Sequence, residues 1–291
     1  MKAQKTSRTA QYMAFFRALE TKRNQKDRIF SDPYAIHFVD SKLRLAVRLS
    51  QYSVFSKYIN HTINKKIPGA LSSGTARTKY IDELLKTAVS NGVQQVIILG
   101  AGFDTRAVRL DFLKSIPVIE IDHPNTSNFK AGIYKKRIGR IPENVTFLQI
   151  DFNKQNLDQL AEENNLDFSK PTAVIWEGVT NYLTEEAVKS TFSFISKFTQ
   201  NSYVIFTYVH KEILKNPELF LGGEKLLKDL EKLEEHWTFG FMPNELPEYL
   251  NQFNIQLLED LGADEYRQKF LPDRAEKGYE FYRTAFAVKK V

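Results

Sequence analysis

Four acidic residues stand at or just after the ends of short apolar runs, a placement that favours a binding site for a polar ligand. Glu120 and Asp122 end the run VIEID, Asp151 follows VTFLQI, and Glu177 follows AVIW. If these runs are parallel strands, their carboxyl ends share one edge of the sheet, where α/β proteins bind ligands. A carboxylate at the end of the second strand can accept hydrogen bonds from both ribose hydroxyls, so Asp122, or Glu120 in its place, is a candidate for that role.

The segment VIILGAGFDTRAVRL, residues 96–110, contains a glycine turn that can approach a ligand closely. Gly100 and Gly102 lack the Cβ that would obstruct a tight turn. A dinucleotide fingerprint needs a third glycine three residues later, but Thr105 stands there, and Asp104 places a negative charge where a pyrophosphate would bind. The turn therefore favours a ligand without phosphates. A phosphate-free nucleoside that carries a positive centre describes S-adenosyl-L-methionine.

Further side chains can complete such a site. Asp151 could accept a hydrogen bond from the adenine amino group while the ring of Phe152 lies against the base, and the planar fork of Arg77 could hold a carboxylate. For the methyl acceptor, His210 is a candidate general base, with a structural histidine as the alternative interpretation. The acceptor-pocket candidates are Tyr182 and Tyr208, although core packing explains Tyr208 equally well.

The elements that must position these residues form an α/β pattern from residue 93 onward. Apolar runs alternate with helical stretches, which predicts a parallel sheet with crossover helices. The last run has Tyr282, Thr284, Phe286 and Val288 at a period of two, as an antiparallel strand would. The predicted seven-stranded, mostly parallel sheet uses the runs 96–99, 118–121, 145–150, 173–176, 203–209, 255–258 and 281–288.

Helical segments flank this core within a predicted single domain. Residues 1–92 are expected to form a helical N-terminal cap, residues 93–291 the Rossmann-like core, and residues 210–250, approximately, a helical insertion after the fifth strand. Within the cap we predict helices over 10–19 and 43–63, with a turn at 31–34. Another helix is predicted to begin at a cap formed by Thr75 and to stop at Asn91-Gly92.

Composition excludes several classes of protein. The 291 residues include no cysteine, which removes disulfides and thiolate metal sites, and the five histidines lack ligand spacing, so we expect no metal. No apolar run approaches the ~20 residues of a membrane helix, so we expect a cytoplasmic protein without a membrane partner. The net charge is +6, and we interpret its densest cluster as a solvated helix face without a nucleic-acid partner: Lys130, Lys135, Lys136, Arg137 and Arg140.

Seven blocks together resemble the leucine carboxyl methyltransferase family of S-adenosyl-L-methionine-dependent enzymes, in particular its bacterial O-methyltransferase branch. In chain order they are SRTAQYMAFFRALE, DRIFSDPYA, TARTKYID, LGAGFDTRA, IEIDHP, LQIDF and WEGVTNYL, which extend over much of the chain. The resemblance implies a class I Rossmann-like methyltransferase fold, S-adenosyl-L-methionine as the cofactor, and methylation of a carboxylate or hydroxyl on a small, acidic or phenolic molecule.

The resemblance also implies a role for individual residues. Arg77 would hold the methionine carboxylate, Gly100 would line the methionyl and ribose portion, and Asp122 would bind the ribose hydroxyls. Asp151 and Phe152 would contact the adenine; the family often has leucine at the second position, but a backbone contact would survive that change. Glu177 would lie near the methionine amino group.

Two other function classes remain open at the level of the sequence. An NAD-dependent oxidoreductase would use the same strand, glycines and acid, although Asp104 and Thr105 disfavour it. A protein that binds the cofactor without turnover would keep the pocket residues and lose the chemistry. The oligomeric state and the identity of the acceptor do not follow from these residues.

Overall fold

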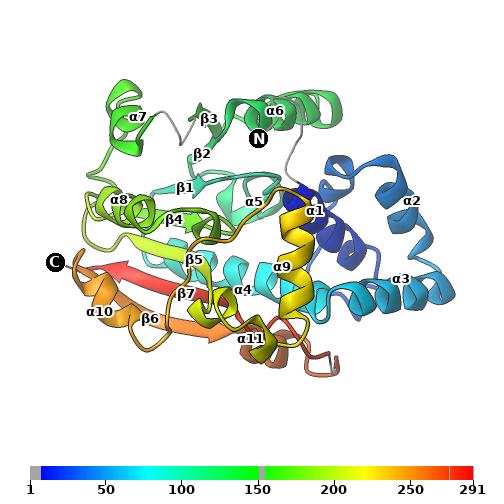
Figure 1. The fold of residues 1–291 in the computed structure, drawn as a ribbon. Helices are drawn as coiled ribbons and strands as arrows, with labels where there is room; N and C mark the ends of the chain where they lie inside the picture. Colours follow the sequence, from blue (N-terminus) through cyan, green and yellow to red (C-terminus); the bar gives the residue numbers. More distant parts are fainter. Residues whose placement is uncertain (1–7, 151–154, 275, 291) are drawn as a thin grey trace.

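A computed structural model of the chain describes residues 8–150, 155–274 and 276–290. Its centre is one sheet with helices on both faces (Figure 1). The strands are β1 (Gln95–Leu99), β2 (Val118–Asp122), β3 (Val145–Gln149), β4 (Thr172–Trp176), β5 (Tyr203–Val209), β6 (Ile255–Gly262) and β7 (Tyr282–Lys289).

The strand order is β3-β2-β1-β4-β5-β7-β6, with parallel pairing among β1 to β5. The last strand, β7, pairs antiparallel with both β5 and β6. This confirms the predicted seven-stranded, mostly parallel sheet with an antiparallel last strand. The order reverses between β1 and β4, and loops that follow these two strands therefore diverge at the place where doubly wound sheets bind ligands.

Strand β6 is four residues longer than the sequence predicts, whereas the bounds of the other strands differ by at most one residue. The prediction ended β6 at Leu258, but β6 continues to Gly262. An irregularity in register between Leu257 and Glu259 interrupts its pairing with β7. A bulge of this kind breaks the alternation of buried and exposed side chains, so the period-two pattern that identifies a strand is lost.

The helix that contains Arg77 begins earlier than predicted. α4 spans Ala70–Ser90 and follows Gly69, which has a left-handed backbone conformation. Thr75 is not its cap: the Thr75 hydroxyl donates to the Leu71 carbonyl at 2.7 Å inside the helix. The predicted end at Asn91 is confirmed. With α11 (Ala263–Phe270), α4 buries apolar side chains against one face of the sheet.

The other face of the sheet is covered by α7 (Leu157–Glu163), α8 (Glu185–Ile195) and α10 (Leu246–Asn251), whose apolar side chains join Trp176 and Phe206 in one core. α5 (Arg106–Arg109) follows the glycine turn, and α6 (Pro124–Ile138) follows β2. Both begin at the carboxyl edge of the sheet.

The N-terminal helices pack against the loop that follows β1. They are α1 (Arg8–Thr21), the 3-10 turn η1 (Ala35–Phe38), α2 (Ser41–Leu49) and α3 (Ser53–Lys66). The single helix predicted over 43–63 is therefore wrong. The Ser50 hydroxyl bonds the Val47 carbonyl at 2.8 Å, a local bond that competes with helix continuation. Buried side chains of α1 and η1 pack with Phe103 of the glycine loop.

The segment after β5 contains the 3-10 turns η4 (Lys211–Leu214) and η5 (Pro217–Leu219) and the helix α9 (Gly223–Lys232). In Figure 1, α1 and α9 lie together at the carboxyl end of the parallel strands. The Thr9 hydroxyl donates to Glu235 at 2.5 Å, which joins α1 to the segment after α9. Two segments that are far apart in sequence thus meet beside the switch point.

Candidate functional site at the carboxyl edge of the sheet

The glycine turn requires glycine at its first position. Gly100 has φ +64°, and a Cβ there would lie 2.4 Å from Val179 Cγ2. The Gly100 N–H donates to the Ile121 carbonyl at 2.8 Å, which fixes the turn against β2. Gly102 also has a positive φ, +47°. The turn after β1 therefore approaches the loop after β4 more closely than any side chain would allow.

Asp122 lies beside this turn. Its Oδ2 accepts a hydrogen bond from the Gly102 N–H at 2.5 Å, and its Oδ1 accepts one from the His123 N–H at 2.6 Å. Burial raises the pKa of Asp122, while these two backbone donors oppose the shift. Each carboxylate oxygen has two lone pairs, so both oxygens retain the capacity to accept a further bond. The structure thus brings Asp122 and Gly102 together, as the sequence interpretation requires.

Arg77 and Glu177 meet at the end of β4. Arg77 Nε lies 3.0 Å from Glu177 Oε1, and both side chains are largely buried. The guanidinium also stacks on the ring of Tyr282, with Cζ 4.4 Å from the ring centroid. Burial raises the pKa of Glu177, but Arg106 and Arg77 outweigh it and hold that pKa below its ordinary value. A buried cation and a buried anion therefore stand side by side at the switch point.

Asp104 does not present a free charge to a ligand. Its carboxylate pairs with Arg106 through the guanidinium and the backbone N–H. Burial alone would raise the pKa of Asp104, yet Arg106 and Lys130 hold it at about 2. The expectation that Asp104 repels a pyrophosphate is therefore wrong in its physical basis, since Arg106 neutralises the carboxylate.

Arg106 connects the two sides of the site, and the sequence interpretation missed it. Its Nη1 lies 2.9 Å from Glu177 Oε2, and its Nε lies 2.8 Å from Asp82 Oδ1. Arg109, one turn along α5, also binds Asp82 at 2.7 Å. The signal in the sequence was the pair of arginines three residues apart directly after a glycine turn, since buried arginines need acidic partners.

Glu120 and Lys130 correct two expectations. Lys130 Nζ lies 2.6 Å from Glu120 Oε2, and each side chain is only 1% exposed. Glu120 thus faces α6, and the ribose role offered to it as an alternative to Asp122 is wrong. Lys130 was expected on a solvated helix face, but it points inward from α6. Burial, opposed by Lys130, raises the pKa of Glu120 to about 7.

α1 contributes two residues that the sequence interpretation did not assign to the site. Arg77 Nη2 donates to Met13 Sδ at 3.3 Å, and Thr9 lies one turn earlier on the same helix. Glu235 Oε2 accepts hydrogen bonds from Thr9 Oγ1 and from Tyr182 Oη, the latter at 3.0 Å. Tyr182 therefore lies close to a carboxylate at the edge of the site, next to the N-terminal helix.

Two acceptor candidates lie in other surroundings. His210 caps η4, where its Nδ1 accepts from the Glu212 N–H at 3.3 Å, and burial lowers its pKa. Tyr208 is fully buried, and its hydroxyl donates to Asp260 Oδ2 at 2.6 Å. Both contacts agree with the structural alternatives, so the acceptor role of Tyr208 and of His210 is not supported by the geometry.

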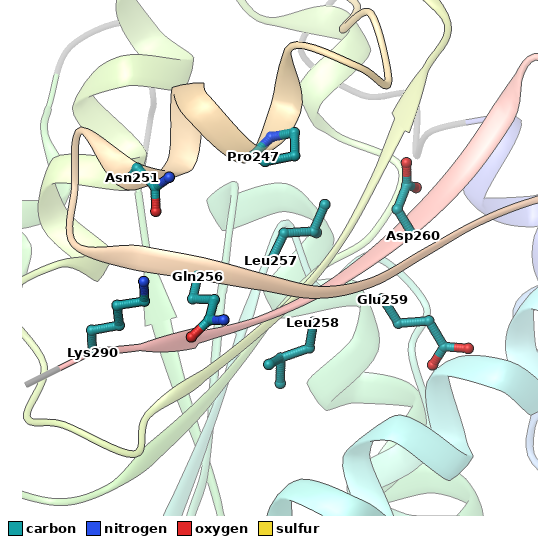
Figure 2. Close-up of a pocket in the computed structure, with 8 residues that line it drawn as sticks. All are labelled: Pro247, Asn251, Gln256, Leu257, Leu258, Glu259, Asp260 and Lys290. Atoms are coloured by element: carbon teal, nitrogen blue, oxygen red, sulfur yellow. The ribbon is translucent and has the colours of Figure 1, made fainter.

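Asp260 also lines a hollow beyond the edge strand β6 (Figure 2). The hollow measures about 310 Å³ and is lined by Pro247, Asn251, Gln256, Leu257, Leu258, Glu259, Asp260 and Lys290. These residues come from α10, β6 and the position after β7, and include none of the predicted site residues. The hollow is therefore separate from the carboxyl edge of β1 and β4.

Asp151 and Phe152, the two predicted adenine contacts, lie outside the described residues. The residue before them, Ile150, is buried, and its N–H donates to the Asp122 carbonyl at 3.0 Å. The chain therefore leaves β3 beside the end of β2.

Comparisons with known proteins assign the chain to a family. The family model for leucine carboxyl methyltransferase matches residues 10–196, so the chain belongs to that family. A relative from Frankia alni is 33% identical over 184 residues, which cover 62% of this chain and 61% of that protein. One from Streptomyces coelicolor is 34% identical over 182 residues, with 62% and 61% covered. Both carry the name "Putative S-adenosyl-L-methionine-dependent methyltransferase". The match thus spans less than two thirds of either relative.

Solved structures support the fold. A DUF574 family protein from Streptomyces avermitilis superposes with a TM-score of 0.59 at 14% identity, covering 94% of this chain and 100% of that one. A "putative methyltransferase" from Thermobifida fusca gives 0.59 at 17% identity, with 94% and 97% covered. The α/β architecture with its helical additions is thus shared at low sequence identity.

Proposed function

We propose that the chain is an S-adenosyl-L-methionine-dependent methyltransferase that methylates an oxygen of a small molecule. The observation that carries the proposal is the buried Arg77–Glu177 pair at the switch point. A methionine end has both a carboxylate and an ammonium group, which match an arginine and a glutamate. A nicotinamide dinucleotide has no amino-acid end, so it would leave this pair without a role.

The residues described at the edge fit the rest of the cofactor. Asp122 keeps acceptor capacity for ribose hydroxyls, and the turn at Gly100 and Gly102 gives the methionyl and ribose portion a close backbone surface. Asp151 and Phe152 remain our candidates for the adenine. The bound cofactor supplies an activated methyl group, and the chain's task is to align an acceptor with it and exclude water.

The acceptor side is proposed to lie between α1, η3 (Thr180–Tyr182) and the segment after α9. There, the Glu235 carboxylate binds the hydroxyls of Thr9 and Tyr182. A hydroxyl acceptor must lose a proton, and Glu235 offers a proton acceptor within reach of Tyr182. A carboxylate acceptor needs no base and would face the charge of Glu235. A hydroxyl, phenolic or aliphatic, is therefore favoured over a carboxylate.

Calorimetric titration of the purified chain with S-adenosylhomocysteine and with NADH tests the cofactor. We expect binding of the first and none of the second. The Glu177→Gln variant should bind the homocysteine compound more weakly, while Glu143→Gln, an exposed acid of the same size, should not change the affinity. Tight NADH binding without any response to S-adenosylhomocysteine would overturn the proposal in favour of an oxidoreductase.

Turnover is tested with methyl-labelled cofactor and a small-molecule extract. A labelled product is expected, and its label should survive mild alkali, because an aryl or alkyl ether is stable where a methyl ester releases methanol. An alkali-labile label would assign the acceptor as a carboxylate. Cofactor binding without any labelled product across such extracts would favour a binding protein without turnover.

A further inference from the structure

The outer surface of α2 and α3 combines exposed apolar side chains with basic ones. We name it the α2–α3 surface. Val54 and Tyr58 are 75% and 69% exposed, although apolar side chains of this size are usually covered. Its apolar members are Leu45, Tyr52, Val54, Phe55 and Tyr58, and its exposed basic members are Lys42, Arg48, Lys57, Lys65 and Lys66.

The charge of this segment has one sign only. Residues 41–66, which include α2 and α3, contain six lysines and arginines and no aspartate or glutamate. The chain as a whole carries 41 basic and 35 acidic residues, so an acid-free stretch of this length is a local feature and not a consequence of composition. A partner that complements this surface therefore combines negative charge with an apolar region.

The geometry of α3 separates two faces. Ile59 and Ile63 are partly buried against the N-terminal core, whereas Val54, Phe55 and Tyr58 project outward beside Lys57. Figure 1 shows α2 and α3 at the margin of the molecule, remote from α7 and α8. The outward residues therefore lie on a helix whose inner side packs against the N-terminal core. They can enter an apolar environment without any unfolding of the N-terminal helices.

We propose that the α2–α3 surface docks the protein peripherally on an anionic lipid bilayer. Tyrosine and phenylalanine favour the boundary between headgroups and acyl chains, and lysines around them bind anionic headgroups. The basic members are long, flexible chains rather than a fixed set of donors, which suits a fluid headgroup layer better than a protein epitope. The helices of the described residues are too short or too polar to span a bilayer. The proposed contact is therefore with the bilayer surface.

This inference revises the expectation that the protein has no membrane partner, which rested on spanning segments alone. It does not depend on the proposed function, because binding to vesicles needs no cofactor. A docked enzyme would have access to an acceptor dissolved in the membrane, and the methyl-transfer reaction itself would be unchanged.

Co-sedimentation of the full chain with vesicles tests the proposal. We expect binding to phosphatidylcholine vesicles that contain phosphatidylserine, little binding to phosphatidylcholine alone, and loss of binding at high salt. The triple variant Val54→Ser, Phe55→Ser and Tyr58→Ser should bind about tenfold more weakly. The matched control is Leu219→Ser with Leu221→Ser, which removes exposed apolar side chains from the loop before α9 and should bind normally.

Two results would overturn the proposal. One is absence of binding to anionic vesicles at low ionic strength by a chain that still unfolds cooperatively. The other is a concentration-dependent dimer in analytical ultracentrifugation that the triple variant abolishes, which would assign the surface to a second copy of the chain. Unchanged thermal unfolding of the triple variant is the fold control. The second variant, Lys57→Glu with Lys65→Glu, leaves the apolar side chains in place and should also weaken binding to anionic vesicles.

Discussion

Arg77 and Glu177 bind each other across 3.0 Å although 100 residues separate them in the chain. Arg77 comes from α4, which packs under the sheet, and Glu177 from the loop after β4. Other elements also fix their positions: Tyr282 stacks on the arginine, and Arg106 binds the second carboxylate oxygen. The pair is therefore held from two sides, by Tyr282 and by Arg106.

Arg106→Lys should weaken binding of S-adenosylhomocysteine about tenfold, which corresponds to about 1.4 kcal/mol. A single ammonium cannot replace the fork that binds Asp82, Asp104 and Glu177 together. The measurement is calorimetric titration, with Arg140→Lys at an exposed ion pair as the control. If Arg106 acts by positioning Glu177, its substitution should have little further effect on affinity in a Glu177→Gln background. An equal loss in both backgrounds would contradict that role.

Gly100→Ala should lower the free energy of unfolding by more than the 1–3 kcal/mol, roughly, of a strained backbone alone. The new Cβ combines a positive φ with a position 2.4 Å from Val179 Cγ2. Gly139→Ala is the matched control: its φ is +85°, but a Cβ there meets nothing within 4 Å. Urea denaturation of both variants separates strain from collision. Equal losses would show that the approach of Val179 is unimportant.

The sheet and the positions of several candidate site residues could be predicted because they depend on local patterns. Short, mostly apolar runs indicate the strands, and their carboxyl ends identify Asp122 and Glu177 without any coordinates. Helix ends also follow local rules. The end of α4 at Asn91 is an example, because the backbone N–H of this cap residue bonds carbonyls of the last turn. The bulged strand β6 lacked that regularity, and its second half was missed.

Residues whose environment depends on tertiary packing could not be predicted. Glu120 and Asp122 differ by two positions, yet one is sealed against Lys130 and the other reaches the glycine turn. No periodicity separates a lysine that faces solvent from one that enters the core. The contacts of Glu235 with Thr9 and Tyr182 likewise join three distant segments, so only the folded chain reveals them.

The contribution of Glu120 to the free energy of unfolding should decrease as the pH rises from about 4.5 to about 7. Its pKa is raised from 4.5 to about 7 in the folded chain, so the folded state binds the proton more tightly than the unfolded state does. The stabilisation is complete below about 4.5 and is lost as the pH passes about 7. Urea midpoints across this range measure the slope, and Glu120→Gln should flatten it. An unchanged slope in that variant would assign the dependence to other groups.

The Glu120–Lys130 pair should behave as a unit. Lys130→Met leaves the buried carboxylate without its cation and should lower the free energy of unfolding by about 3–5 kcal/mol at about pH 9, where Glu120, with its pKa of about 7, is ionised in the parent chain. Adding Glu120→Leu removes the uncompensated charge, so the double variant should recover most of that loss. A double-mutant cycle measured in urea gives the coupling. Additive losses in the two single variants would contradict a coupled pair.

Asp32→Asn should loosen the N-terminal helices from the glycine turn. The buried carboxylate binds Arg17 at 2.8 Å and the Thr105 hydroxyl at 2.6 Å, so it joins α1 to the loop after β1. Burial raises the pKa of Asp32, but Arg17 and Arg109 outweigh it and lower that pKa.

Asp32 therefore contributes stability above its ordinary pKa of 3.8, and this contribution is lost as the pH falls through the lowered value. At neutral pH, hydrogen exchange in Asp32→Asn should accelerate over residues 8–21 while the strands β1 and β4 keep their protection. Asp111→Asn, at an exposed acid that pairs with Lys114, is the control and should leave α1 unchanged. Equal acceleration in the strands would mean that Asp32 supports the whole fold instead of the attachment of α1, because loss of a global anchor raises exchange everywhere.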